Sequence, residues 1–292
     1  MKKGSTKSIR ETLKNIADRE RIDFQILIIR YLHERLLYRV ANSEYANNFI
    51  LKGGLLLYVI EGLHIRPTKD IDMLARQIDN NVEQMKQIFQ SICSVKYDDD
   101  CVYFDIPGIE TAYISENDKY MGVRVLVNTG LDTIRQRLQI DVGFSDVITP
   151  APVNLSYPVL INELEIPEIK AYSIETVIAE KFHAMIEHGI FNSRMKDFYD
   201  VHILLKNNKI DNDLLQQSIL QTFKNRNTIF DANHPLFTES FREDQNRQIR
   251  WKAFLRKMKI SENLEFPFVV KFIIERLQPI YNEVFNDQSK IK

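Results

Sequence analysis

The sequence contains few cysteines and no long apolar run. Its 292 residues include only two cysteines, Cys93 and Cys101. Two cysteines cannot form a disulfide framework in a chain of this length, so we expect free thiols and a cytoplasmic location. The basic N-terminus is not followed by an apolar segment, and no run of about eighteen apolar residues occurs. The sequence therefore predicts neither secretion nor a membrane span.

An excess of one charge sign is also absent. The chain has 39 Lys and Arg residues against 40 Asp and Glu residues. This balance provides no overall field that would attract nucleic acid, although a local basic patch can still bind RNA. Apolar residues make up 44% of the chain, which is enough to build the core of one large domain or of two ordinary domains.

The periodicity of apolar residues predicts an α+β half followed by a helical half. Residues 102–144 read as extended, with a hairpin turn at the Asn-Thr-Gly of residues 128–130. After Ser173 the pattern is helical almost to the end of the sequence. We therefore expect domains at 1–165 and 166–292. The other predicted elements are helices at 8–21, 24–43, 55–62 and 80–95, strands at 47–52 and 68–74, and a proline-marked connector at 149–173.

Two aspartates alternate with apolar residues in the predicted strand at 68–74. Successive side chains of a strand point to opposite faces, so Asp70 and Asp72 share a face with Thr68, and Ile71 and Met73 share the other. Two neighbouring carboxylates repel each other unless a cation or a proton separates them. Mg²⁺ is the natural candidate for an all-oxygen site. The alternative is a solvated strand edge that carries two acids.

A third acid, Asp141, lies between Ile140 and Val142 in another predicted strand. A carboxylate in a buried strand needs a partner. If this strand neighbours the one at 68–74, Asp141 completes a cluster of three carboxylates, which is typical of metal-dependent phosphoryl transfer. The alternative is an ion pair between Asp141 and an arginine such as Arg124 or Arg137.

Further candidates are a pair of glycines and a group of charges in the helical half. Gly53 and Gly54 stand between a strand and a helix, where backbone N–H groups can bind a phosphate, although such a pair is more often a simple turn. Lys181 could bind a phosphate with Asp197 as its partner. The alternatives are a solvated lysine and acids that stabilise the start of a helix. The histidines His183, His188 and His202 lack a zinc-binding spacing.

Three blocks of the sequence resemble the AbiEii/AbiGii toxin family of nucleotidyltransferases. They read FILKGGLLLYVIEGLHIRPTKDIDML, LQIDVGFSDVITPAP and AYSIETVIAEKFHAMIEHGIFNSRMKDFYDVHIL, follow the family's order, and cover residues 49–205. The most specific part is AEK followed by NSRMKDFYD. The resemblance implies a nucleotidyltransferase core of the polymerase-β type with a mixed sheet, followed by a helical C-terminal domain. It also implies a toxin of a type IV toxin–antitoxin, abortive-infection system, with an antitoxin encoded nearby.

The resemblance also implies an activity and roles for particular residues. The expected reaction transfers a nucleoside monophosphate from an NTP to the 3′ end of an RNA, the acceptor end of tRNA, with Mg²⁺ as cofactor. The implied residues are Asp70, Asp72 and Asp141 as metal-binding and catalytic acids, Lys181 and Asp197 as further catalytic residues, and Gly53, Gly54, Arg66, Thr68 and Lys181 as nucleotide-binding residues.

The chain departs from the family pattern directly after the glycines. The family usually has Ser or Thr at this position, where this chain has Leu55, so a hydroxyl that could bind a phosphate is missing. Two other classes of function stay open: a nucleotide- or RNA-binding module without catalysis, and a metal-dependent phosphohydrolase or nuclease. Basic C-terminal segments offer a patch for RNA. Trp251 lies in one of them and could stack a base or fill the core.

Overall fold

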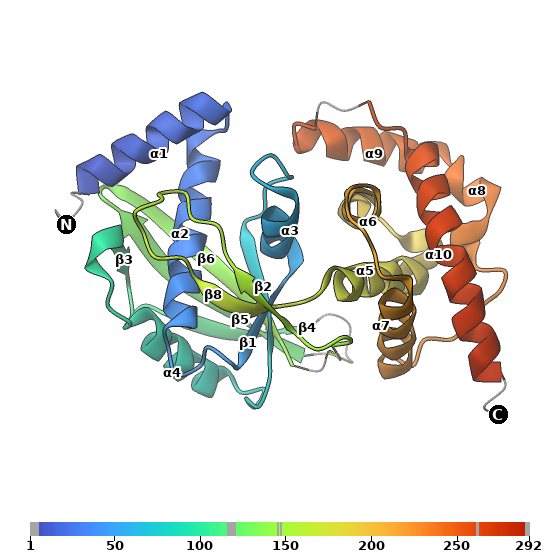
Figure 1. Ribbon diagram of the computed structural model, residues 1–292, viewed down its shortest axis with the longest axis horizontal. Coiled ribbons are helices and arrows are strands. Elements are labelled where there is room, and N and C mark those ends of the chain that lie inside the picture. Colours follow the sequence, from blue (N-terminus) through green and yellow to red (C-terminus); the bar gives the residue numbers. More distant parts are fainter. Residues whose placement is uncertain (1–5, 116–120, 145, 147, 261–262, 290–292) are drawn as a thin grey trace. The chain divides into compact units, whose positions relative to one another are not determined.

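The computed structural model describes residues 6–115, 121–144, 146, 148–260 and 263–289. The chain divides into two compact units (Figure 1). The sheet unit comprises Met1–Ile60, Pro67–Ser145 and Val153–Ala171, and the helical unit comprises Glu61–Arg66, Asp146–Pro152 and Tyr172–Lys292. The expected order, an α+β part with a mixed sheet followed by helices, is confirmed. The expected boundary after residue 165 stays a prediction.

The sheet unit is built around a mixed sheet in the order β3-β5-β6-β2-β1-β8-β7, with β4 also paired to β5. β2 and β6 are parallel, as are β1 and β8, and the other pairs are antiparallel. The strands are β1 (Phe49–Lys52), β2 (Asp70–Ala75), β3 (Val102–Phe104), β4 (Glu110–Ser115), β5 (Met121–Leu131), β6 (Ile134–Gly143), β7 (Val153–Ser156) and β8 (Glu168–Ala171). The helices are α1 (Thr6–Glu20), α2 (Phe24–Ala41), α3 (Gly53–Glu61) and α4 (Val82–Cys93).

One face of this sheet forms the core of the sheet unit. Ile71 and Met73 of β2 are buried, and so are Leu138, Ile140 and Val142 of β6. The helices α2 and α4 contact each other, and they contact β8 and the β4–β5 pair, respectively (Figure 1). The residues that alternate with this apolar set, including both aspartates of β2, are therefore directed to the opposite face.

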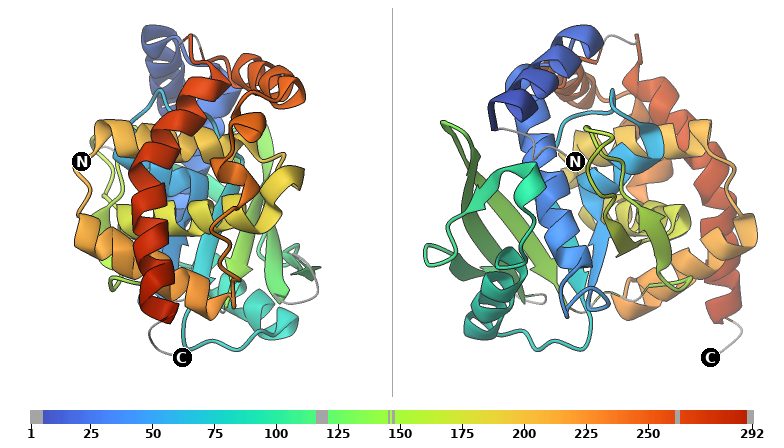
Figure 2. Two further views of the ribbon diagram at one scale, coloured as in Figure 1. Left: turned by 90° about the vertical axis from the view of Figure 1, so that its right-hand side faces the viewer. Right: turned by 60° about the vertical axis from the view of Figure 1, so that its left-hand side comes forward.

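The helical unit contains the second half of the chain. α5 packs against α6 and α7, and the long α10 packs against both of these helices (Figure 2). Its helices are α5 (Ile174–His188), α6 (Met195–Asn207), α7 (Asn212–Asn225), α8 (Glu239–Arg242), α9 (Gln245–Lys257) and α10 (Phe266–Ser289). This unit also contains the short 3₁₀ turns η2 (Gly189–Phe191) and η3 (Pro235–Phe237), whereas η1 (Asp98–Asp100) belongs to the sheet unit. No helix among the described residues is long and apolar enough to cross a membrane.

Three local predictions were wrong. The Asn-Thr-Gly of residues 128–130 lies inside β5, and the hairpin turns two residues later, where Leu131 pairs with Ile134. The connector at 149–173 contributes β7 and β8 to the sheet. The helix predicted to start at Ser8, with Ser8 and Glu11 as a capping box, already begins at Thr6, so Ser8 lies inside α1. In each case strand pairing or helix packing outweighs the local signal.

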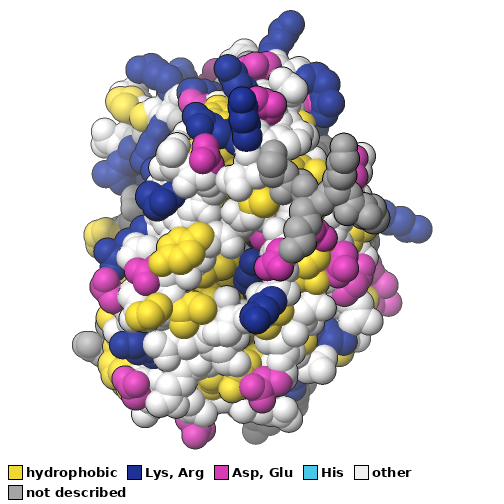
Figure 3. All heavy atoms as spheres, turned by 90° about the vertical axis from the view of Figure 1, so that its left-hand side faces the viewer, with side chains coloured by type: hydrophobic (Ala, Val, Ile, Leu, Met, Phe, Trp, Pro, Cys, Tyr) yellow, Lys and Arg dark blue, Asp and Glu magenta, His cyan; other side chains and the backbone are white. Residues whose placement is uncertain are grey.

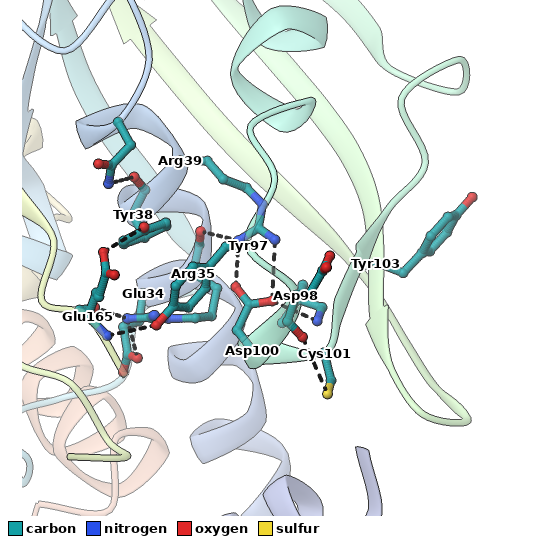
Figure 4. A network of polar contacts seen from close by, with 12 residues as sticks. Glu34, Arg35, Tyr38, Arg39, Tyr97, Asp98, Asp100, Cys101, Tyr103 and Glu165 are labelled. Carbon is teal, nitrogen blue, oxygen red and sulfur yellow. Dashed lines mark hydrogen bonds and ion pairs between the residues drawn. The ribbon is translucent and has the colours of Figure 1, made fainter. Parts of the chain in front are cut away.

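A network of charged and polar contacts connects side chains of α2 with the segment around Asp100 (Figure 4). The Arg39 guanidinium donates to both carboxylate oxygens of Asp100, at 2.6 and 3.3 Å, and both side chains are almost fully buried. Arg35 forms an ion pair with Glu34 at 2.8 Å, also buried. Burial raises the pKa of the Glu34 carboxyl to about 7. Pairing is required here because an isolated buried charge is strongly unfavourable.

Replacing Asp100→Asn removes one charge of this buried pair. Because Arg39 would keep a buried charge without its carboxylate, we expect the free energy of unfolding to fall by about 3–5 kcal/mol. The exposed neighbour Asp99 provides a matched control, and Asp99→Asn should change stability by less than about 0.5 kcal/mol. Urea unfolding of the two variants measures the difference. Equal stabilities would show that the Arg39–Asp100 pair does not stabilise the fold.

Candidate functional site

Four charged residues form a row across neighbouring strands on the face opposite the core. Asp72 pairs in register with Asp141, and the row continues to Lys52 of β1 on one side and to Arg124 of β5 on the other. Residues paired across strands project to the same face of a sheet. The row therefore reads cation, anion, anion, cation. The parallel pairing of β2 with β6 brings together Asp72 and Asp141, which lie 69 positions apart in the sequence.

The two glycines lie directly against this row. β1 ends at Lys52, and Gly53, the first residue of α3, has a left-handed conformation with φ of 68°. A Cβ atom on Gly53 would collide with the Asp72 carboxylate, and one on Gly54 would lie 2.7 Å from the Thr68 hydroxyl oxygen. Glycine is therefore needed at both positions for the helix N-terminus to approach the acids, and a helix N-terminus favours anions.

Asp141 is held by two neighbours on the same face. Arg124 donates to its two oxygens at 2.8 and 2.9 Å, and Gln139 donates to one of them at 3.0 Å. The arginine partner considered from the sequence is therefore present. Among the described residues, no group of three Asp, Glu, His or Cys side chains is placed to hold one metal ion. Asp70 and Asp72 remain a fitting pair of carboxylates, since Mg²⁺ is commonly held by one or two carboxylates together with phosphate oxygens.

The sequence predictions did not include Lys52. It follows the apolar residues of β1 and precedes Gly53, and it is the cross-strand partner of Asp72. A lysine at the end of a buried strand, directly before a glycine pair, was the available signal. Cross-strand neighbours of opposite charge stabilise each other, so Lys52 offsets part of the repulsion between the acids.

In the helical unit, Lys181 lies between two buried aspartates. Its Nζ atom is 2.8 Å from Asp197 and 2.7 Å from Asp200, and both carboxylates are fully buried. Arg66 donates twice to Asp200, each time at 2.6 Å, and Arg194 donates to Asp197 at 2.6 Å. The three cations and two acids come from α5, α6 and the segment before β2. We call these five residues the lysine–aspartate network.

The pKa values of this network follow from its ion pairs. Burial alone would lower the pKa of Lys181, but Asp200 and Asp197 outweigh burial and raise it above its ordinary value. Burial would raise the pKa of Asp197, but Lys181 and then Arg194 hold it below its ordinary value. Lys181 and Asp197 therefore both stay charged near neutral pH. The network keeps one more positive charge than negative, which suits an anionic ligand.

Residues 35–272 match the protein family described as nucleotidyl transferase AbiEii toxin, type IV TA system. The match spans most of the chain. This chain belongs to that family. Membership makes it a nucleotidyltransferase toxin, and it implies an NTP substrate, a divalent metal as the typical cofactor, and an antitoxin partner.

A comparison with solved structures gave weak matches. JHP933 from Helicobacter pylori has a TM-score of 0.45 and 13% sequence identity, over 90% of this chain and 96% of that chain. An antigenic nucleotidyltransferase-like protein from Paracoccidioides brasiliensis has a TM-score of 0.42 and 13% identity, over 78% of this chain and 88% of that chain. No curated protein matches this chain.

Two residues that the sequence left open lie in the core of this AbiEii family member. Leu55, which replaces the family's usual hydroxyl residue, is 1% exposed. Trp251 is fully buried, and its indole N–H donates to the Leu264 carbonyl at 2.6 Å. The core alternative therefore holds for Trp251, which cannot stack a base.

The lysine–aspartate network predicts how stability depends on pH. Lys181→Met removes the cation shared by two buried carboxylates, so at pH 7 we expect the free energy of unfolding to fall by about 3–5 kcal/mol. In the wild type, the stabilisation by Asp197 is present above its ordinary pKa and is lost as the pH falls through its lowered pKa. In the variant, acid instead relieves repulsion by protonating the carboxylates.

The difference between wild type and variant should therefore shrink as the pH approaches about 4. Urea unfolding at several pH values measures this difference. Lys224→Met is the matched control, because Lys224 is an exposed lysine on α7, outside the lysine–aspartate network. A difference that grows on acidification would contradict the assigned ion pairs.

Proposed function

We propose that this protein transfers a nucleoside monophosphate from an NTP to the 3′ end of an RNA, the acceptor end of tRNA. The observation that carries the proposal is the placement of Asp70 and Asp72 on one face of β2, with Asp72 directly against Gly53. A metal-bound triphosphate needs carboxylates to hold the metal and backbone N–H groups to bind its phosphates, and a helix N-terminus beside acids offers both. Family membership supports the reaction class.

In this proposal Asp70 and Asp72 would hold Mg²⁺, which would supply positive charge to the phosphates of the NTP. The backbone of Gly53 and Gly54, with Thr68, binds the phosphates. Asp141 acts as the third acid and orients or deprotonates the attacking 3′-hydroxyl group. Arg124 and Gln139 fix the direction of the Asp141 carboxylate.

The residues of the helical unit contribute positive charge in the same proposal. Lys181 neutralises the triphosphate, and Asp197 keeps the ammonium group charged and in place. Arg66 contributes positive charge near the nucleotide, either while it stays paired with Asp200 or after a phosphate replaces Asp200 as its partner. Electrostatic stabilisation of this kind is commonly the largest contribution to catalysis of group transfer.

The acids are tested by Asp70→Asn and Asp72→Asn. Each variant should incorporate labelled NMP into total RNA about a hundredfold or more slowly than the wild type, because charge stabilisation in the transition state is lost. Asp79→Asn is the matched control, since Asp79 is exposed beyond the end of β2. Equal rates in all proteins would eliminate the acids from the reaction. NTP binding without pyrophosphate release would indicate a binding module, and shortened RNA would indicate a hydrolase.

The glycine turn is tested by a pair of alanine variants. Gly53→Ala and Gly62→Ala impose a similar left-handed strain, since φ is 68° at Gly53 and 86° at Gly62. Only at Gly53 would the new methyl group collide with Asp72, whereas a Cβ at Gly62 meets nothing within 4 Å. Gly53→Ala should therefore abolish Mg²⁺-dependent NTP binding, and Gly62→Ala should cost about 1 kcal/mol of stability. Titration with an NTP and Mg²⁺ measures the first effect. Unchanged binding by Gly53→Ala would exclude the turn from the nucleotide site.

A further inference from the structure

The strand that carries Asp141 continues into a second polar region on the same face. Arg135 and Arg137 lie four and two residues before Gln139 in β6 and therefore share the face of Gln139 and Asp141. At a rise of about 3.3 Å per residue, Arg137 lies about 13 Å and Arg135 about 20 Å along the strand from Asp141. This distance corresponds to a few nucleotides of single-stranded RNA.

A pocket of about 400 Å³ opens at this end of β6. Its volume lies within the range of sites for small ligands such as a nucleotide. The side chain of Tyr103 is 58% exposed, and Figure 4 shows it pointing away from the buried network. An exposed aromatic ring beside amide and guanidinium groups can stack a base and bind its edge. The lining residues used here are Tyr103, Asp105, Asn128, Arg135, Gln136 and Arg137.

The two arginines of the pocket can respond to a phosphate. Arg135 donates to the backbone carbonyls of Asp132 and Ile134, at 2.6 and 3.0 Å, which leave its positive charge uncompensated. Arg137 pairs with Glu110 at 2.6 Å, but the two side chains are 47% and 64% exposed. An exposed ion pair of this kind is weak, so a phosphate can replace Glu110.

A basic stripe of α1 lies next to the same hairpin. Lys7, Arg10 and Lys14 are exposed and spaced three and four residues apart, which places them on one side of the helix. Arg10 pairs with Asp132 in the β5–β6 turn at 3.0 Å. In Figure 3, Lys and Arg side chains gather near the top of the view, which is the end of the molecule where Figure 1 shows α1. Such a local basic patch is what a nearly neutral protein needs to bind RNA.

We propose that Tyr103, Arg135, Arg137 and the basic stripe of α1 form the binding surface for the single-stranded 3′ region of the acceptor RNA. A base stacks on Tyr103 a few nucleotides before the reacting hydroxyl, and the arginines bind the backbone between them. Acidic Asp105 beside amides suits base edges better than a uniformly anionic membrane. This inference rests on the proposed transfer to RNA.

The test measures RNA binding separately from catalysis. Fluorescence anisotropy with a labelled single-stranded RNA oligonucleotide and with total tRNA, without NTP, gives the dissociation constant at several salt concentrations. Tyr103→Ala should weaken binding about tenfold, whereas Tyr103→Phe should bind like the wild type because stacking survives. Arg135→Gln with Arg137→Gln should weaken binding about tenfold or more and reduce the salt dependence by about one to two counterions.

Matched controls separate the surface from general effects. Arg76→Gln removes an exposed arginine beyond the far end of β2, and it should bind RNA like the wild type. All variants should keep the wild-type affinity for an NTP with Mg²⁺, which also reports a folded protein. Loss of RNA binding in Tyr103→Ala with retained NTP binding supports the surface. Unchanged RNA binding in Tyr103→Ala and in the double arginine variant overturns it, as does equal weakening by Arg76→Gln.

The outcome is distinguishable from failure of the proposed function. If the wild type lengthens RNA while the pocket variants bind and transfer normally, the transfer reaction stands and this surface is wrong. If the wild type lengthens no RNA but the pocket variants lose RNA binding, the surface stands and the transfer reaction is wrong. A protein partner at this surface would be indicated if the variants lose binding of purified antitoxin and keep RNA binding, which also overturns the proposal.

Discussion

The parallel register between β2 and β6 is the constraint on which the candidate site depends. This register pairs Asp72 with Asp141 on one face of the sheet. It also pairs Ile71 with Ile140 and Met73 with Val142, and these apolar side chains are buried on the other face. A slip by one residue would exchange the two faces, burying carboxylates and exposing the core. The same apolar contacts that stabilise the sheet therefore fix the positions of the acids. The geometry of the candidate site therefore follows from core packing in the sheet unit.

Placing acids side by side has an electrostatic cost, which the chain offsets with neighbouring cations rather than by burial. Lys52 and Arg124 flank the acid pair across the strands, and Arg124 makes a two-bond contact with Asp141. The lysine–aspartate network of the helical unit also pairs acids with neighbouring cations, but there three cations face two acids. One unit thus presents acids that suit a metal, and the other presents positive charge that suits a phosphate.

Alternation alone was enough to predict that Asp70, Asp72 and Asp141 point away from the apolar face of their strands, because the two-residue period of a strand is a local property of the sequence. Family resemblance supplied their order and the fold. The ion pair between Arg66 and Asp200 joins residues 134 positions apart and leaves no local signal.

The turn at 128–130 was misplaced for a related reason. Asn-Thr-Gly is a plausible turn on its own, but pairing of β5 with β3 and β6 keeps Gly130 extended. A side chain at Gly130 would also meet the Ile134 carbonyl.

Leu55 shows how one position can serve packing at the expense of a ligand contact. A hydroxyl at this point of α3 would add one bond to a phosphate, worth about 0.5–1.5 kcal/mol for an ordinary hydrogen bond and more to a charged group. Burying a leucine side chain contributes about 1.5–3 kcal/mol to folding. The exchange therefore favours stability while the backbone N–H groups of the turn remain available. In the proposed site, phosphate contacts would then depend more heavily on the backbone at Gly53 and Gly54, where the close approach of Asp72 and Thr68 leaves no room for a side chain.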